Sequence, residues 1–435
     1  MEGKVPLRRA LGLFEVTVSG IGIILGAGIY SLLGQAAGLA GNAVWISFLL
    51  SAVVAVFTGL SYAELASMFP KASAEYEYTS QAFGRFPAFV IGWLIIFSGV
   101  IGAATVALGF AGYLRALTGA PLLPAALLLL AALSAVVILG IKQSARLAVA
   151  FTAIEISGMV LVVLIGIPYI GRADYFEMSP LGLSGIFRAS ALIFFAFLGF
   201  EEMVKLSEEA KDPEKNIPRA LILAISGSIV IYIMVALSAV SVLGWERLSS
   251  STAPFSDIGR SALGQEASAV LSVIALFATT NTVLLMLVSS SRIIYGMAGS
   301  CCLPTWLASV HPRRQTPWRA SLLSMLLSMA FVFLGDIALV ANINNFTVFV
   351  TFIVINSVLI VLRYKKPQME RPFRVPVSWG RLPLLPMLGI LLNAFMLAHL
   401  DRQVMAIGLA LTLSGTIAAL ANRWRRSGRG CRRRD

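Results

Sequence analysis

Charged side chains are scarce in this sequence, and so are cysteine and histidine. Only 13% of the 435 residues are charged, while 58% are hydrophobic. An ordinary soluble domain has about a quarter of its residues charged. A chain with so little charge and so much apolar surface is excluded from the class of ordinary water-soluble proteins, and it is expected to fold in a membrane.

The rare residue types also limit the chemistry. Cys301, Cys302 and Cys431 form an odd set without metal-ligand spacing, so we expect neither a disulfide framework nor a metal site, and we read Cys301 and Cys302 as small loop residues. His311 and His399 are too few for a His-based catalytic triad. No other catalytic constellation gathers near one membrane face. The sequence therefore predicts no enzymatic activity, no metal and no cofactor.

Apolar runs follow one another through the whole chain. About 20 such residues suffice for one helical span, and charges, Gly or Pro bound each run. The pattern predicts an all-α membrane protein with twelve transmembrane helices. They are expected at 11–33, 42–63, 86–114, 121–140, 147–170, 185–207, 219–243, 267–298, 317–334, 337–362, 382–398 and 403–422.

Basic residues divide unequally between the two sides of these spans. If the N-terminus lies inside, 28 of the 34 Lys and Arg residues fall on inner segments and six on outer ones. This asymmetry predicts both termini in the cytoplasm. Topology also explains the net charge of +13 better than nucleic acid binding does, because the charges are dispersed over many short loops. The basic tail, 423–435, either contacts anionic lipid or simply follows the same rule.

The first span is rich in glycine. Four glycines fall within nine residues, and each interior glycine weakens a helix by about 1 kcal/mol relative to alanine. Gly20 and Gly22 are read as sites of close helix packing. Gly26 and Gly28 lie near mid-membrane, where an opened turn would expose amide groups that attract a carboxylate.

The sixth span combines Gly199 with Glu201 in an otherwise apolar segment. A carboxylate there is too costly to be incidental. Spans one and six would be the first helices of two five-helix repeats, and broken helices at matching positions are typical of secondary transporters. The pattern therefore indicates a transporter site between these two spans.

Short motifs follow one another in a characteristic order from about residue 11 to residue 386. They are Gly22-Ile23-Ile24-Leu25-Gly26-Ala27-Gly28-Ile29-Tyr30, Tyr62-Ala63-Glu64-Leu65, Pro70, Tyr76-Glu77-Tyr78, Phe200-Glu201, Glu208-Glu209-Ala210-Lys211-Asp212-Pro213, Asn216-Ile217-Pro218-Arg219, Ser291-Arg292-Ile293, Tyr295-Gly296-Met297 and Arg371-Pro372-Phe373-Arg374-Val375-Pro376. In this order they resemble the amino acid-polyamine-organocation superfamily, particularly its cationic amino acid transporter-like branch.

The resemblance implies the leucine-transporter fold. That fold has two inverted five-helix repeats, here 11–170 and 185–362, followed by two additional helices in 382–422. A cytoplasmic N-terminus, 1–10, would precede them and the basic tail would follow. The resemblance also implies a permease that moves its substrate by alternating access around a mid-membrane site.

Carried over to this sequence, the resemblance implies a site made mostly of backbone groups. The amides of Ala27 and Gly28 would hold the substrate carboxylate, and nearby carbonyls would receive its ammonium group. Phe197 or Phe200 would act as an aromatic gate. The carbonyls belong to Ile24, Phe195 and Leu198, and the whole expected substrate-binding set is Ile24, Gly26, Ala27, Gly28, Phe195, Ala196, Phe197, Leu198, Gly199 and Phe200.

Glu155 stands where proton-coupled relatives often carry a lysine. It lies about 12 Å into the membrane, where a carboxyl group is able to bind and release a proton near neutral pH. We expect the neutral form to donate a hydrogen bond to carbonyls near Gly22 or to Thr279. A static hydrogen-bonded carboxyl and a cation site are the alternatives. Thr279 and Thr280, with Asn281, would supply oxygens if the coupling ion were Na⁺; H⁺ is favoured.

Glu64 and Arg292 lie at the inner ends of spans two and eight. They are expected to form either an inner-gate ion pair or a static structural one, with Glu201 as a further gate residue. The sequence thus predicts a multi-pass permease of the plasma or inner membrane that moves amino acids and is proton-coupled. A basic amino acid or polyamine exchanger is the alternative. A channel or receptor is disfavoured, because neither a polar pore stripe nor a sizeable soluble domain is present in the sequence.

Overall fold

The fold is described from a computed structural model, which covers residues 11–70, 74–139, 145–208, 210–300 and 302–428. Three of the sequence-based predictions fall outside these described residues: the N-terminal segment 1–10, Cys301, and the part of the basic tail from 429 to 435, which contains Cys431.

The described residues form sixteen α-helices, five short 3-10 helices and one two-stranded hairpin. The α-helices are α1 (Leu13–Ile24), α2 (Gly28–Ala40), α3 (Val44–Met68), α4 (Ala74–Phe83), α5 (Arg85–Thr118), α6 (Leu122–Leu139), α7 (Ala145–Gly166), α8 (Gly182–Ile193), α9 (Phe200–Met203), α10 (Pro213–Ser250), α11 (Pro254–Leu263), α12 (Gln265–Gly299), α13 (Trp318–Val332), α14 (Ile337–Lys365), α15 (Leu384–Ala398) and α16 (Arg402–Gly428). The other elements are η1 (Gly41–Ala43), η2 (Ile167–Tyr169), η3 (Phe194–Phe197), η4 (Val204–Glu208), η5 (Thr305–Ala308), β1 (Ser378–Trp379) and β2 (Leu382–Pro383).

Helices occupy every segment predicted to span the membrane. Ten predicted spans each coincide with one α-helix, whereas the first and sixth are each divided into shorter pieces, as their glycines predicted. Helices α4 and α11 were not predicted. Helix α10 is interrupted at Gly244, whose φ of 73° and ψ of 159° are not helical and are readily adopted only by glycine, so the predicted end at residue 243 coincides with this interruption.

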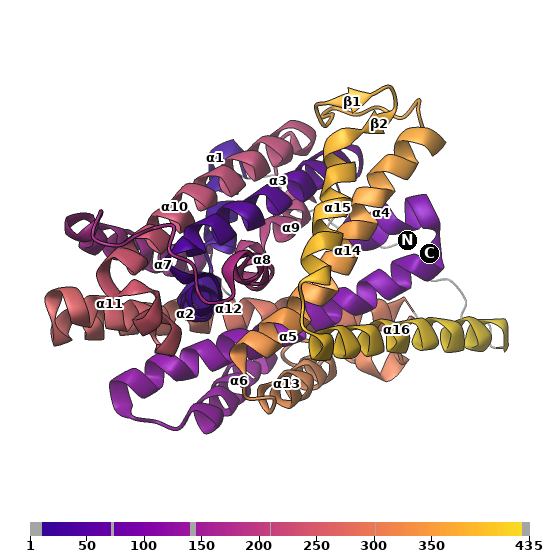
Figure 1. Cartoon of the computed structure of the whole chain (residues 1–435). Coiled ribbons are helices and arrows are strands. Elements are labelled where there is room, and N and C mark those ends of the chain that lie inside the picture. The colour runs from indigo at the N-terminus through magenta and orange to yellow at the C-terminus, as the bar shows by residue number, and fades with distance from the viewer. Residues whose placement is uncertain (1–10, 71–73, 140–144, 209, 301, 429–435) are drawn as a thin grey trace.

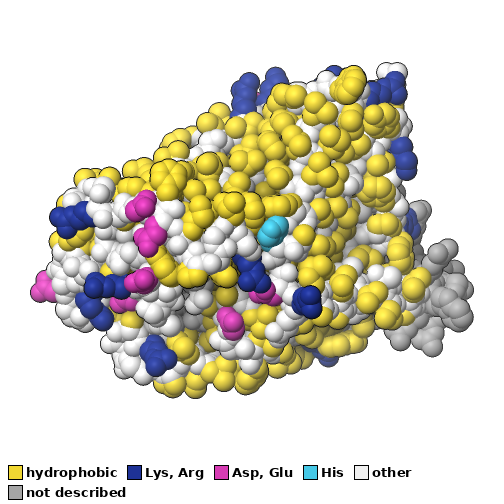
Figure 2. All heavy atoms as spheres, viewed as in Figure 1, with side chains coloured by type: hydrophobic (Ala, Val, Ile, Leu, Met, Phe, Trp, Pro, Cys, Tyr) yellow, Lys and Arg dark blue, Asp and Glu magenta, His cyan; other side chains and the backbone are white. Residues whose placement is uncertain are grey.

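The outer surface of these helices is apolar. Nine segments of the described residues are long and apolar enough to cross a membrane, and α1, α13 and α15 are shorter apolar helices. Outward-facing side chains such as Leu128 (72% exposed) and Ile417 (66% exposed) belong to them. In Figure 2 apolar side chains cover the broad upper and right part of the visible face. An all-helical surface of this kind, with its backbone groups satisfied inside the helices, identifies a multi-pass membrane protein.

Charged side chains gather at the margins of this apolar surface. Along the upper right edge of Figure 2 those in view are Lys and Arg, whereas both signs are present toward the left and centre. The upper right edge lies near β1 and β2 in Figure 1, in the 363–381 connection that the sequence predicts to be cytoplasmic.

The two divided helices lie side by side in opposite directions. Helix α1 packs against α9, and α2 packs against α8. Other helices pack in matching pairs, α3 with α10, α5 with α12 and α6 with α13. Figure 1 shows α2, α8 and α12 near the middle of the molecule. The divisions of the two helices therefore meet inside the protein rather than at its surface.

A short antiparallel hairpin follows α14. Ser378 pairs with Pro383 and Trp379 with Leu382. The sequence had predicted helix from residue 382, but β2 takes up the first two of these positions, so α15 begins at Leu384. The hairpin forms the last part of the connection between α14 and α15, at the upper right of Figure 1.

Candidate functional site

The first divided helix opens over three residues. Helix α1 ends at Ile24, Leu25 leaves helical geometry (φ −72°, ψ 19°), and α2 begins at Gly28 after Ala27 as its N-cap. The first amides of a helix have no partner within the helix, and the dipole makes that end attractive to an anion. The predicted break at Gly26 to Gly28 is therefore confirmed, and it points a helix N-terminus into the protein interior.

The second divided helix opens around Gly199. Helix α8 passes into η3, Leu198 is extended (φ −63°, ψ 144°), and Gly199 has a φ of 123°, which L side chains rarely adopt. Helix α9 then begins at Phe200. The Gly199 amide donates a hydrogen bond of 2.9 Å to the Glu201 carboxylate. Glu201 thus caps its own half-helix; its predicted role as a gate stays a prediction.

The two breaks touch each other through small residues. A Cβ atom added at Gly28 would lie 2.6 Å from the Cα of Ala196. A Cβ atom added at Gly199 would lie 2.8 Å from the carbonyl oxygen of Ile23. Real Cβ atoms do not approach backbone atoms this closely, so only glycine lets the two backbones meet. The structure brings the predicted substrate-binding segments 24–28 and 195–200 into direct contact.

Tyr232 of α10 joins the two breaks. Its hydroxyl group lies 2.6 Å from the Ile24 carbonyl oxygen and 2.7 Å from the Ala196 carbonyl oxygen. The hydroxyl group has one hydrogen, so it can donate to only one of these acceptors at a time. Sequence reasoning missed Tyr232. The available signal was the single tyrosine of this span, between Ile231 and Ile233.

A threonine from α12 also reaches the first break. The Ala27 amide donates a hydrogen bond of 3.2 Å to the Thr282 hydroxyl. Thr279, which the sequence predicted as an ion-coupling residue, donates its hydroxyl hydrogen to Ala275 within the same helix. Thr282 is thus the α12 threonine bonded to this break, and the cation role of Thr279 and Thr280 stays a prediction.

Glu155 lies buried on α7, with 1% of its surface exposed. Its Oε1 atom accepts a hydrogen bond of 3.3 Å from the side-chain amide of Asn281 on α12. The sequence had predicted Thr279 or the carbonyls near Gly22 as partners. Asn281 is found instead, and Gly22 packs closely against Thr152, one turn before Glu155. The Tyr30 hydroxyl of α2 donates to the main-chain carbonyl of Glu155, so the span-one segment contacts this residue through α2.

The aromatic residues of the second break are buried in separate clusters. Phe197 packs edge-on against Tyr232, with ring centroids 5.1 Å apart. Phe200 packs against Tyr62 at 5.8 Å and Phe352 at 5.3 Å. Phe195 is also buried, with 3% of its surface exposed. Phe197 therefore lies on the Tyr232 side of the break and Phe200 on the other, and the aromatic gate stays a prediction.

The predicted ion pair between Glu64 and Arg292 is wrong. Glu64 is fully buried and pairs with Arg363, whose Nη2 lies 2.5 Å from Oε2. The Arg371 Nε atom lies 3.3 Å from Oε1. Arg292 is exposed. Arg363 comes from α14, and the 366–377 loop folds back so that Arg371 and the Val375 amide also reach Glu64.

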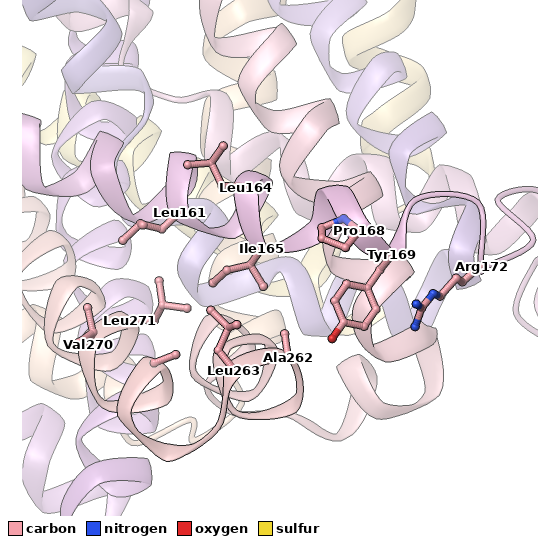
Figure 3. Close-up of a pocket in the computed structure, with 11 residues that line it drawn as sticks. Leu161, Leu164, Ile165, Pro168, Tyr169, Arg172, Ala262, Leu263, Val270 and Leu271 are labelled. Carbon is pink, nitrogen blue, oxygen red and sulfur yellow. The ribbon is translucent and has the colours of Figure 1, made fainter.

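A separate hollow of about 560 Å³ lies between the ends of α7 and α12, against α11. Figure 3 shows Leu161, Leu164 and Ile165 on one side and Leu263, Val270 and Leu271 on the other, with Tyr169 and Arg172 at one end. None of its lining residues belongs to either break. The lining is almost entirely apolar. It does not offer the paired polar groups that a zwitterion requires.

No group of three or more His, Cys, Asp and Glu side chains within the described ranges is placed to hold a metal ion. The chemistry available at the breaks is hydrogen bonding by amides, carbonyls, neutral hydroxyl groups and the Glu201 carboxylate, with Glu155 as a nearby buried carboxyl. This arrangement can bind a small zwitterion, but it contains no nucleophile paired with a base.

The sequence is similar to those of known proteins over most of its length. The profile of a family described as "amino acid permease" matches residues 11–410. The branched-chain amino acid permease BcaP of Bacillus subtilis is 31% identical over 441 residues, covering 95% of this chain and 93% of that protein. The methylthioribose transporter of Bacillus subtilis is 32% identical over 405 residues, covering 88% and 86%. The human cationic amino acid transporter 4 is 30% identical over 390 residues, covering 83% of this chain and 61% of that protein.

Proposed function

The chain belongs to the amino acid permease family, and we propose that it is a secondary active transporter that moves an amino acid across the membrane by alternating access. The family and the named relatives are transporters rather than enzymes. The observation that carries the proposal is the direct contact between two helix breaks, where backbone amides and carbonyls converge in the interior. Broken helices paired in this way form the central sites of such transporters.

We propose that the membrane domain consists of twelve spans, with two inverted five-helix repeats followed by two additional helices. In this arrangement the equivalent helices of the two repeats are spans one and six, two and seven, three and eight, and four and nine. The corresponding helices pack against one another in each of these four pairs. The opposite directions of the two divided helices support a repeat related by an axis in the membrane plane.

The carboxylate of the substrate is assigned to the N-terminus of α2. The Ala27 amide, now bonded to the Thr282 hydroxyl, would exchange this neutral acceptor for the substrate carboxylate. Hydrogen bonds to charged groups are worth more than those between neutral ones, so the exchange is favourable. Thr282 would return to the amide when the substrate leaves.

The ammonium group is assigned to carbonyls at the two breaks. Because Tyr232 can donate to only one of the Ile24 and Ala196 carbonyls, the other retains a free lone pair. The Phe195 carbonyl accepts a weak bond of 3.3 Å from the Leu198 amide, so it too can turn toward a stronger donor. These acceptors, on both helices, would let one substrate hold the two breaks in a fixed arrangement.

The side chains around the breaks favour neutral, apolar amino acids over basic amino acids and polyamines. The break residues Ile24, Ala27, Ala196 and Phe197 are apolar, and the Glu201 carboxylate is engaged with the Gly199 amide. A basic substrate would need a carboxylate free to face its distal charge. The named relatives include both a branched-chain and a cationic amino acid transporter, so the comparison between these two classes is the informative one.

The test is uptake by purified protein in proteoliposomes. Radiolabelled leucine, lysine, putrescine and methylthioribose are compared, with competition by unlabelled substrates and a thermal-shift screen of the twenty amino acids. Saturable leucine uptake without chemical turnover is the expected result. Saturable transport of lysine or putrescine alone would replace the neutral assignment, and no saturable transport of any amino acid would reject the proposed function.

We further propose that H⁺ is the coupling ion and that Glu155 carries it. Glu155 is bonded to the neutral amide of Asn281, and among the residues that the structure describes no basic side chain forms an ion pair with it, so we propose that the proton is carried on this carboxyl group. Glu155→Gln mimics the protonated form. We expect it to keep substrate exchange but to lose accumulation driven by an imposed pH gradient. Glu246→Gln, at an exposed carboxylate on α10, is the matched control.

Accumulation by Glu155→Gln in response to external acid would remove Glu155 from the coupling role. Dependence on Na⁺ instead of pH would point to the Thr279 and Thr280 oxygens. Exchange of internal for external substrate without any accumulation by the wild-type protein would support the exchanger alternative. The site of action is proposed to be the cell membrane with both termini in the cytoplasm, as the distribution of Lys and Arg indicates; cysteine labelling from each side of the membrane tests this orientation.

A further inference from the structure

Four arginines surround one cavity in the connection between α14 and α15. The cavity has a volume of about 410 Å³, within the range of roughly 300–1,000 Å³ that ligand sites occupy. Its lining residues are Arg363, Pro367, Gln368, Met369, Arg371, Arg374 and Arg381. We infer that this arginine cavity is a binding site for a phosphate group. It lies away from the helix breaks, and its function is independent of the proposed transport site.

Two of the four arginines are fixed by internal partners. Arg363 is 3% exposed and donates hydrogen bonds to both carboxylate oxygens of Glu64 and to the Ser378 hydroxyl. Arg371 is 10% exposed, donates to the carbonyls of Met369, Leu362 and Lys366, and forms an ion pair with Glu64. These two guanidinium groups are therefore held in place and form a rigid wall.

One carboxylate faces this group of four cations. Glu64 is fully used, because its Oε2 atom also accepts the Val375 amide at 2.7 Å. Arg374 and Arg381 are exposed, and within the described part of the chain no carboxylate forms an ion pair with either of them. Glu370 belongs to the same loop but does not line the cavity. The cavity therefore carries an excess of positive charge that a bound anion would balance.

The electrostatics of Arg371 support the same conclusion. Burial lowers the pKa of its guanidinium group; the Glu64 carboxylate opposes this change, and the like charges of Arg363 and Arg374 add to it. The Arg371 Nε atom is buried without a well-formed hydrogen bond. A buried donor without a good acceptor, and repulsion between like charges, destabilise the folded protein unless a further group such as a bound anion compensates them.

Phosphate is the anion that matches this geometry. Guanidinium groups bind phosphate oxygens through paired, parallel hydrogen bonds, and arginine is over-represented at phosphate sites for this reason. A phosphate group reaches the cavity either as the headgroup of an anionic phospholipid or as a soluble phosphate compound. The connection follows a membrane-spanning helix directly, so both sources have access.

The experiment separates these sources. Purified full-length protein in neutral detergent is titrated with sodium pyrophosphate, inorganic phosphate or sodium chloride at matched ionic strength, and the unfolding midpoint is followed by intrinsic fluorescence. In a second arm, protein in nanodiscs of phosphatidylcholine is compared with protein in nanodiscs that also contain phosphatidylglycerol. A ligand that binds only the folded protein raises the midpoint.

The test variant is Arg374→Gln/Arg381→Gln, which removes the two exposed cations and leaves the Glu64 pairs intact. The control is Arg313→Gln/Arg314→Gln, which removes two exposed arginines that do not line the cavity. We expect pyrophosphate or phosphatidylglycerol to stabilise the wild type and the control. In the test variant we expect the apparent affinity to fall at least about tenfold, as loss of charged hydrogen bonds predicts.

Each outcome decides between the alternatives. Stabilisation by pyrophosphate or phosphate identifies a soluble ligand, and stabilisation by phosphatidylglycerol alone identifies a lipid headgroup. A response to chloride as large as that to phosphate would overturn the inference, and so would an equal response of the test variant and the control, since either result would mean general screening rather than a site. Absence of any response in both arms would also overturn it.

Discussion

The two polar regions of this protein differ in the chemical groups that form them. The contacts found at the helix breaks join backbone amides and carbonyls mainly to the neutral hydroxyl groups of Tyr232 and Thr282, with one bond from the Gly199 amide to the Glu201 carboxylate. The region under the α14–α15 connection joins charged side chains, with Glu64 held between Arg363 and Arg371. Both are buried, so the difference lies in chemistry rather than in exposure.

This difference determines what each region is able to do. Neutral hydrogen bonds contribute about 0.5–1.5 kcal/mol each and can be exchanged for bonds to a substrate at little cost. Breaking a buried ion pair leaves a charge in a poorly polarisable surrounding, which costs several kcal/mol. The breaks are therefore suited to rearrangement during transport, and the Glu64 pairs are suited to holding one end of the molecule together.

The largest effect is expected for Glu64→Gln. Removing the carboxylate charge leaves Arg363 buried without compensation, which we expect to lower the free energy of unfolding by about 3–5 kcal/mol. The measurement is the unfolding midpoint in detergent together with the yield of folded protein from membranes. A variant as stable as the wild type would show that the ion pairs of Glu64 do not stabilise the fold.

The next largest effect is expected for substitutions of Gly28. Gly28→Ala places a Cβ atom 2.6 Å from the Ala196 Cα position, which forces the two breaks apart. We expect overpacking to cost about 1–3 kcal/mol and uptake to be lost, more completely in Gly28→Val, while membrane yield survives. Gly227→Ala is the control, because its added methyl group meets only ordinary contacts at 3.6 Å. Normal uptake by both Gly28 variants would reject the substrate site at the breaks.

A smaller effect is expected for Tyr232→Phe. The change removes the hydroxyl group between the Ile24 and Ala196 carbonyls and retains the ring. We expect a loss of about 1 kcal/mol in stability and a changed rate of substrate exchange. Tyr295→Phe, at a side chain that is 38% exposed, serves as the control. If the two variants behaved alike in both measurements, Tyr232 would be a packing residue only.

The smallest effect is expected for Asp401→Asn. Asp401 pairs with Arg188, but the two side chains are 58% and 38% exposed, so water screens the interaction. We expect the unfolding free energy to fall by less than about 1 kcal/mol. Comparison with Glu64→Gln, measured under the same conditions, isolates the contribution of burial to the strength of an ion pair. A loss as large as that of Glu64→Gln would contradict this account of the two ion pairs.

The helix breaks could be predicted because glycine acts locally. Each interior glycine weakens a helix whatever surrounds it, so Gly26, Gly28 and Gly199 mark the breaks, and Gly199 also takes a positive φ. The partners of the breaks could not be predicted in the same way. Tyr232 and Thr282 come from helices that are distant in sequence, and their reach depends on the rotation of each helix about its axis.

The same distinction explains the ion pairs and the surroundings of Glu155. Glu64 and Glu155 were identified as unusual because a carboxyl group in an apolar segment is costly wherever it lies. Their partners were misassigned: Glu64 meets Arg363 and Arg371 rather than Arg292, and Glu155 meets Asn281 rather than Thr279. Each helical residue is a rotation of about 100°, so Thr279 and Asn281, two positions apart on α12, face different directions. Arg371 reaches Glu64 from a loop, whose path is set by tertiary packing.

The sequence by itself determined the membrane environment, the positions of the long apolar helices, the two breaks and the carboxyl groups that required partners. These properties depend on composition and on local backbone preference, which are present in the unfolded chain. Only the tertiary structure decided which residues meet: Tyr232 between two carbonyls, Thr282 on the Ala27 amide, and four arginines around one cavity. Such contacts arise because packing fixes the orientation of each helix and the path of each loop, and no local preference encodes these.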